Sequence, residues 1–481
     1  MSAATPATPA TPATPATPAP PPQRGSAIAE YFKFAERGTD FTTEIRAGLT
    51  TFMVMAYIIF VNPSILTAGF KDLDPAFTFP ALAAATALIA GIMTIAMGAV
   101  SNYPLALAAG LGINGIVAFT LIGKGLSPAG AMGVIVLEGL LVTVFVVLGL
   151  REAIMNAVPL ALKKAIGVGI GLFILFIGFA NGGLIKAGSG TLVTVAFPTT
   201  TAQFVFIIGL IITIALYVLK IRAALIISIL VTTVIALVPP VFGLDKVTTL
   251  PSADSFSFAP SFSTLGRFDL GNVFNLGLLT AILTIFAIML TDFFDTMGTV
   301  TGVAAEAGLA REDGSVPDIG RVLFVDSVAA AVGGLAGTSS NTTYIESAAG
   351  VAEGGRTGFA SIVTGVLFLL AIFLSPIAGI VPGVATAPAL VLVGYLMFTL
   401  VRDIKVAEVE DGIPALLTMI LMPLTYDITV GIGAGFISWV LIKVVRGKMA
   451  EVHPLMWVVA AAFVVYFLQD WILAFGAAAP A

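Results

Sequence analysis

Apolar stretches about as long as a bilayer is thick recur along nearly the whole chain after residue 45. A helix needs about 20 predominantly apolar residues to cross the hydrocarbon core. The pattern predicts an all-α polytopic membrane protein with fourteen segments, near 46–69, 79–100, 104–123, 129–150, 160–181, 203–219, 223–242, 274–300, 319–336, 338–353, 358–380, 384–401, 412–427 and 429–445. A further apolar stretch at 456–475 is left unassigned.

Composition supports this class. Of the 481 residues, 58% are hydrophobic and 10% are charged, whereas a soluble domain carries about 25% charged residues. Cysteine is absent and His453 is the single histidine, which argues against a disulfide framework and a histidine-rich metal centre. We therefore expect no cofactor.

The first residues differ in character from the rest. Ala-Thr-Pro repeats run from residue 4 to residue 18, and proline at every third position favours an extended chain without a packed core. Residues 1–25 are therefore predicted to be a disordered tail, not a signal peptide. Residues 26–45 mix aromatic and charged side chains, which predicts a short amphipathic helix in the membrane interface.

The basic residues indicate an orientation. If the fourteen segments alternate and the amino terminus is cytoplasmic, most of the 22 Lys and Arg residues fall in cytoplasmic loops, as the positive-inside rule requires. The exceptions are Lys71, Lys124, Lys186, Lys246 and Arg267. We expect a multi-pass protein of the cell membrane, surrounded by lipid and without a nucleic-acid partner.

Two of the predicted segments are poor spanning helices. Segment 104–123 carries Gly110 and Gly112, and segment 338–353 is polar although apolar segments flank it. Irregular backbone survives at membrane depth only where protein or a cavity surrounds it, and paired interruptions at matching positions point to a transporter's binding site. This predicts two inverted seven-segment repeats, 46–242 and 274–445, with a linker at 243–273 and the extra apolar stretch within 274–481.

Acidic residues inside apolar segments are the strongest chemical signal. Asp292 and Asp295 lie three residues apart, so a helix places them on one face, and an Asp at the bilayer centre costs about 2.5–3.5 kcal/mol. Close like charges cannot both ionise cheaply, so one can hold a proton and release it when solvent access changes. Alternatively, Asp292 braces a neighbouring helix. Glu346, in the second interrupted segment, is expected to face the same cavity.

Other polar residues are more ambiguous. Asp326 is expected to bond to neighbouring backbone or side chains rather than to substrate, and it remains a candidate for proton coupling. Glu138 fits either a proton relay or an interhelical hydrogen bond. Asn114, next to Gly112, fits either a substrate contact or a backbone brace.

Several short motifs lie at separate places in the chain. They are TTEIRAGLTTF (42–52), AYI (56–58), VNP (61–63), GLGIN (110–114), DFFDTMGT (292–299), TSSNTTYIES (338–347) and MPLTY (422–426). Together they resemble a known family, the AzgA-like purine permeases, which belong with the nucleobase/ascorbate transporters (nucleobase:cation symporter-2) and share the uracil-permease fold. Asp427 departs from the family, where serine is expected.

The resemblance implies a core domain of segments 1–4 and 8–11 and a gate domain of segments 5–7 and 12–14. It also implies short strands in segments 3 and 10 and a homodimer formed through the gate domain. Proton symport of hypoxanthine, guanine or adenine by alternating access is the implied activity. By motif position, Asp295 and Glu346 take the places of the family's substrate-binding carboxylates, and Asn114 that of a polar contact. Thr343 and Gly112 are predicted as further substrate-binding residues, and Asp292, Asp295 and Asp326 as the proton-coupling residues.

The chemistry of the candidate residues agrees with a neutral base as substrate. Carboxylates accept strongly from ring N–H groups, whereas an anion would need Lys or Arg in the cavity, and the core segments carry such residues only at their starts, Arg46 and Arg321. This disfavours sulfate and bicarbonate carriers of the same architecture. A channel is a further alternative, as is an intramembrane aspartyl protease suggested by Tyr426-Asp427. The chain lacks the Gly-x-Gly-Asp setting that such a protease needs.

Overall fold

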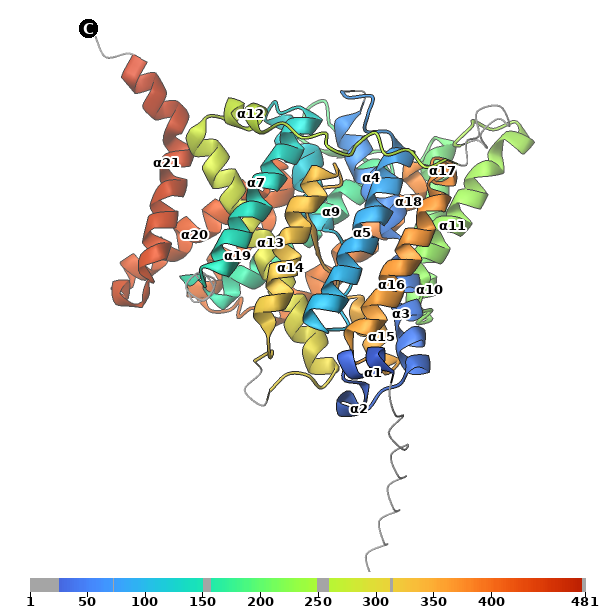
Figure 1. Ribbon diagram of the computed structural model, residues 1–481. Helices are drawn as coiled ribbons and strands as arrows, with labels where there is room; N and C mark the ends of the chain where they lie inside the picture. The colour runs from blue at the N-terminus through green and yellow to red at the C-terminus, as the bar shows by residue number, and fades with distance from the viewer. Residues whose placement is uncertain (1–25, 72, 150–156, 249–258, 312–314, 478–481) are drawn as a thin grey trace, which may run out of the picture.

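The computed structural model describes residues 26–71, 73–149, 157–248, 259–311 and 315–477. The predicted disordered tail, 1–25, lies outside them. The described part is a bundle of long helices whose axes run roughly between two faces, with α1 (Ala27–Tyr31) and α2 (Phe34–Arg37) at one face and α12 (Leu270–Val273) at the other (Figure 1). We call these the α1 face and the α12 face.

The elements follow the predicted segments closely. The first half contains α3 (Phe41–Met55), α4 (Ile58–Phe70), α5 (Phe79–Ser101), β1 (Leu107–Ala109), α6 (Leu111–Gly115), the π-helix η1 (Ile116–Leu121), α7 (Pro128–Val147), α9 (Leu160–Asn181), α10 (Thr201–Val218) and α11 (Ala224–Leu237). The second half contains α13 (Leu278–Glu306), α14 (Ile319–Leu335), β4 (Asn341–Thr343), α15 (Ser347–Ala352), α16 (Gly358–Ala371), α17 (Ser375–Ala378), α18 (Gly383–Phe398), α19 (Val409–Thr425), α20 (Ile428–Val445) and α21 (Pro454–Ala477).

Within the described residues, nine helical stretches are long and apolar enough to cross a membrane. Segment 223–242 is one of those that form a shorter helix. Helix α11 ends at Leu237 because Pro239 and Pro240 follow, and proline cannot continue a helix's hydrogen bonding. Helix α13, in contrast, continues to Glu306, beyond the predicted end near residue 300.

Polar residues at the helix starts bond to free backbone N–H groups. The Thr78 hydroxyl accepts from Ala81 N and is followed by Pro80 in the first turn of α5. Ser127 accepts from Gly130 N, directly before Pro128 opens α7. These are preferred N-cap and first-turn residues, so the sequence itself marks where these helices begin.

The two interrupted segments pair with each other through antiparallel strands. In the register of β1 and β4, Leu107 lies opposite Thr343 and Ala109 opposite Asn341. The pairing extends beyond the strands, because Gly110 N donates to Ser340 O (2.8 Å) and Tyr344 N donates to Ala106 O (2.9 Å). The two strands expected from the family resemblance are therefore present.

Side chains from adjacent helices bond to the remaining strand backbone. The Thr94 hydroxyl on α5 accepts from Leu107 N at 2.9 Å and lies 3.1 Å from Leu107 O. The Ser347 hydroxyl at the start of α15 accepts from Ala106 N at 2.9 Å. Buried backbone groups must be paired in this way, so the strands are fixed by both halves of the chain.

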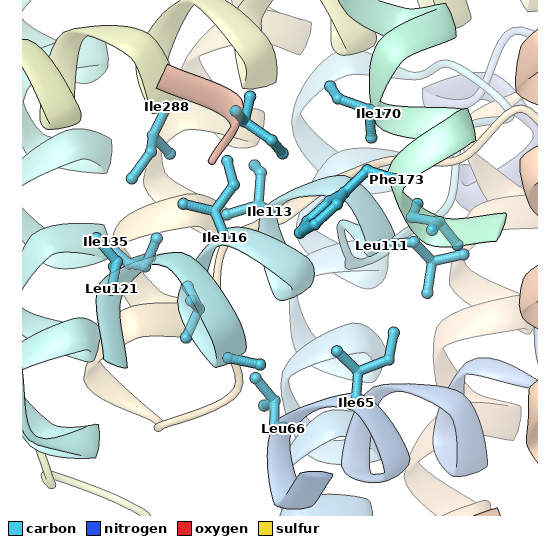
Figure 2. Packing of buried hydrophobic residues seen from close by; sticks show 14 of the residues in the cluster. Ile65, Leu66, Leu111, Ile113, Ile116, Leu121, Ile135, Ile170, Phe173 and Ile288 are labelled. Carbon is cyan, nitrogen blue, oxygen red and sulfur yellow. The ribbon is translucent and has the colours of Figure 1, made fainter. Parts of the chain in front are cut away.

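A hydrophobic cluster holds α6 and η1 in place. Leu111, Ile113 and Ile116 point among side chains of α4, α7, α9 and α13, with Phe173 of α9 lying beside them (Figure 2). Phe173 is fully buried. The segment of α6 and η1, where regular α-helical hydrogen bonding is interrupted, is thus surrounded by protein on several sides.

The amino-terminal segment differs from the predicted single helix over 26–45. It forms α1 and α2, separated at Lys33, whose φ of 58° is left-handed. The rings of Phe32, Phe34 and Phe41 all lie edge-on to Phe359 at the start of α16. The aromatic side chains therefore pack against the protein body, which explains the break.

The unassigned apolar stretch forms α21, which stands at the edge of the bundle (Figure 1). It contacts α20 and α13. The Phe436 and Phe463 rings meet edge to face at 6.1 Å between centroids.

Glycine allows close contact between α5 and α16. A Cβ at Gly98 would overlap the carbonyl oxygen of Gly358, and a Cβ at Gly358 would overlap that of Gly98.

Gly98→Ala should therefore destabilise the protein by about 1–3 kcal/mol, the usual cost of overpacking. The check is a lower melting temperature of the purified protein in detergent. Gly123→Ala is the control, because nothing lies within 4 Å of that added Cβ; equal melting temperatures for both variants would contradict the prediction.

Candidate functional site

The two aspartates of α13 lie in different environments although they are three residues apart. Asp292 is 1% exposed, whereas Asp295 is exposed. Asp292 interacts electrostatically with Glu138 and Asp326 inside the bundle. Of the two carboxylates, only that of Asp295 is accessible, which agrees with the alternative that Asp292 lies against a neighbouring helix.

Glu346 is the acidic neighbour of Asp295. It is half-buried directly before α15 and interacts electrostatically with Asp295. The Tyr57 hydroxyl donates to Glu346 Oε1 at 2.6 Å. Tyr57 is 1% exposed and lies where α3 ends and α4 begins, so a break in the first spanning element positions the carboxylate.

An accessible stripe leads along α13 from Asp295 toward the α1 face. Gly298, Gly302 and Ala305 are all exposed, and spacings of three and four residues put them on the same side of a helix as Asp295. Nothing lies within 4 Å of a Cβ placed at Gly298. The side of α13 that carries Asp295 is therefore open from that residue to the end of the helix.

Asp326 on α14 forms hydrogen bonds with both β4 and α13. Its Oδ1 accepts from Thr343 N at 2.9 Å, and its Oδ2 accepts from the Thr296 hydroxyl at 2.7 Å. Thr296 in turn lies 2.7 Å from the Thr342 hydroxyl. These bonds to neighbouring backbone and side chains are the kind expected for Asp326 from the sequence, and they join the strand to the helix that carries Asp295.

The remaining candidates lie in β4 and in α6, the short helix that follows β1. The Thr343 hydroxyl is buried without a partner among the described residues, as are both polar atoms of the Asn114 side chain. A Cβ at Gly112 would lie 2.5 Å from Ile170 Cγ2, so this glycine allows α6 to pack against α9. Asp295 lies on the accessible stripe and interacts electrostatically with Glu346, whereas Asn114 is fully buried.

Toward the α12 face the same region is closed. The Tyr426 ring lies edge-on to Phe119, Phe173 and Phe176, at 5.3–5.9 Å between centroids. The Thr120 hydroxyl of η1 donates to Tyr426 O at 2.8 Å. An aromatic cluster thus joins η1, α9 and the end of α19.

Asp427, the departure from the family pattern, has two roles in this closed region. Its carboxylate accepts from Thr429 N at 2.8 Å and so caps α20. It also forms a 2.8 Å ion pair with Lys124, which follows η1; the two side chains are 13% and 19% exposed.

Sequence reasoning missed several of these contacts. Tyr57 stood in a matching motif (56–58) without an assigned role, and the break between α3 and α4 beside it lies inside a segment that was predicted to be continuous. Thr296 also lay within a motif. The pairing of Lys124 with Asp427 joins residues far apart in the chain, which no local pattern indicates.

The fold of the chain is similar to that of solved membrane proteins. The transmembrane domain of the cyanobacterial bicarbonate transporter BicA matches with a TM-score of 0.55 and 15% identity, covering 82% of this chain and 96% of that one. SLC26A9 matches with a TM-score of 0.60 and 12% identity, covering 87% and 67%. At these identities the likeness shows the fold alone.

The sequence identifies the family. The model of the permease family matches residues 42–434, so the chain belongs to this family and is a multi-pass membrane protein, not an enzyme. Guanine/hypoxanthine permease PbuG of Bacillus subtilis is 42% identical over 442 residues, which is 91% of this chain and 99% of that protein. Adenine permease AdeP of Escherichia coli is 38% identical over 439 residues, or 91% and 95%. The recognised family is thereby confirmed.

The ion pair between Lys124 and Asp427 should stabilise the closed α12 face. Asp427→Asn keeps a capping side chain but removes the charge, and Lys124→Met removes the partner. A double-mutant cycle on melting in detergent should give a coupling energy of about 0.5–3 kcal/mol, as for residues in contact. The exposed pair Lys405 and Glu408 is the control and should give less than about 1 kcal/mol. Additive effects at Lys124 and Asp427 would contradict the prediction.

Proposed function

We propose that this permease imports purine bases, namely hypoxanthine, guanine or adenine, across the cell membrane by proton symport with alternating access. The observation that carries the proposal is the pair of neighbouring carboxylates, Asp295 and Glu346, at an accessible stripe beside the two paired strands. Relatives named as guanine/hypoxanthine and adenine permeases support the substrate class.

The pair suits a flat, uncharged heterocycle. Purines carry ring N–H and, in some cases, amino donors, and carboxylates are strong acceptors for them. Buried polar groups in β4 and in α6, namely the Thr343 hydroxyl and the Asn114 amide, are further candidates to form hydrogen bonds with the base. Each would gain a partner on binding, which favours substrates with several polar edges.

The fold alone does not select this substrate, because solved neighbours include a bicarbonate transporter and an anion transporter. The charge at the candidate site distinguishes the two cases. An anion beside Asp295 and Glu346 would be repelled, and none of the described ion pairs brings a Lys or Arg to either carboxylate. A neutral base that donates hydrogen bonds is therefore the better fit.

Alternating access is supported by the asymmetry along α13. The side of Asp295 is open toward the α1 face, while Tyr426 and its three phenylalanine neighbours close the region toward the α12 face. With a cytoplasmic amino terminus, this is an inward-open state. The closing contacts join η1 of the proposed core domain to α9, α19 and α20 of the proposed gate domain, so relative movement of the two domains would open the other side.

Removing either carboxylate charge should abolish transport. Asp295→Asn and Glu346→Gln are each expected to reduce uptake of radiolabelled hypoxanthine to the background of cells without the permease, because a strong acceptor is lost. Membrane fractions probed for an epitope tag should contain normal amounts of both variants. Competition by guanine, adenine, xanthine and uracil then ranks the substrates.

Glu306→Gln is the matched control, because this exposed glutamate lies at the end of the same helix. Its uptake should equal that of the unmodified protein. Normal uptake by both Asp295→Asn and Glu346→Gln would refute the site assignment.

Tyr57→Phe tests how Glu346 is positioned. The ring remains, but the 2.6 Å hydrogen bond to Glu346 Oε1 is lost. A hydrogen bond to a charged group contributes about 1.5–3 kcal/mol, so we expect the KM for hypoxanthine to rise at least about tenfold, with surface expression unchanged. An unaltered KM would show that this hydroxyl does not position the carboxylate.

A further inference from the structure

Glu138 is a buried acid to which the proposed substrate site gives no role. It lies on α7, is 0% exposed, and neither carboxyl oxygen has a hydrogen-bond partner among the described residues. The helices around it are tightly packed: a Cβ at Gly139 would overlap the backbone nitrogen of Ala331 on α14. An ionised carboxylate without a donor in such a place would be very costly.

A second acid points into the same region. Asp292 on α13 interacts electrostatically with Glu138, and its Oδ1 also lacks a partner. Asp326 differs, because two donors, Thr343 N and the Thr296 hydroxyl, bond to its two oxygens. Asp326 is therefore suited to carry a charge, whereas Glu138 and Asp292 are not both suited to do so.

Among the described elements packed against α7, the one cation is Arg321 in the first turn of α14, and this residue is exposed. Helix α13 contributes Asp292, with Asp295 one turn further on, and α14 contributes Asp326. Neither α12 nor η1 contains a titratable residue. The ion pairs formed within the described part of the chain involve none of these acids. Neighbouring carboxyl groups without a cation avoid repulsion most cheaply when one of them holds a proton.

We propose that Glu138 and Asp292 form the binding site of the coupling proton, separate from the carboxylates that face the base. This inference rests on the proposed function and specifies where its cation binds. One proton adds to a carboxylate oxygen of the pair and removes one of its two negative charges, and the same proton leaves when the pair gains access to the opposite side.

The contacts around Asp292 connect this site to the substrate site. Asp292 also interacts with Thr342 of β4, and Thr342 lies 2.7 Å from Thr296, which bonds Asp326. A change of charge at the pair therefore acts on β4 and on the helix turn that carries Asp295. This gives the proton a direct influence on the position of the groups proposed to bind the base.

The test uses purified full-length protein in liposomes that contain a pH-sensitive dye. For the unmodified protein, external hypoxanthine should acidify the lumen, and an inward proton gradient should drive accumulation. Glu138→Gln should retain counterflow exchange of radiolabelled hypoxanthine, because the base site is intact, but lose both acidification and accumulation. Asp292→Asn should behave in the same way.

Thr284→Val is the matched control. Thr284 is also on α13, fully buried, with an unpartnered hydroxyl, but it has no carboxyl group, so coupling should remain normal. Acidification at the unmodified rate by Glu138→Gln would overturn the proposal, as would accumulation driven by a sodium gradient without acidification. Loss of counterflow in a Glu138→Gln protein with an unchanged melting temperature would also overturn it. If the proposed function itself is wrong, the result differs from all of these, because even the unmodified protein would then show no hypoxanthine counterflow.

Discussion

The whole site depends on the need to pair backbone polar groups where two segments leave helical geometry inside an apolar bundle. Unpaired N–H and C=O groups away from water each cost several kcal/mol. Here β1 and β4 bond to each other, and Thr94 and Ser347 bond to the backbone at β1. Asp326 then ties β4 to α13 through Thr343 N and Thr296. The position of Asp295 relative to Glu346 follows from this chain of bonds.

Much of the fold could be predicted from the sequence, because the length of an apolar stretch and the residues that begin or end a helix can be read from neighbouring positions. Segment 160–181 coincides with α9, and the glycines and polar residues of the two interrupted segments mark the strands. Local pattern also indicated that α13 carries unusual acids. It could not tell that Asp292 turns inward while Asp295 is exposed, because that depends on where α7 and α14 pack.

Contacts between distant segments were the least predictable. The Tyr57 hydroxyl bonds to Glu346, which is 289 residues further along the sequence, and the ion pair of Lys124 and Asp427 also joins residues from the two halves of the chain. Asp427 looked like a departure from a family pattern, yet it both caps a helix and pairs with a cation. The roles assigned to Asn114, Thr343 and Gly112 stay predictions, since burial and unpartnered atoms fit both binding and bracing.

The strand pairing also bears on how the chain is made. Because β1 belongs to the first half and β4 to the second, the backbone of β1 has no strand partner until most of the protein has been synthesised. Until β4 is made, the backbone groups of β1 that bond to it lack their final partners, although buried backbone groups need to be paired. The first half therefore completes its hydrogen bonding only when the second half is present.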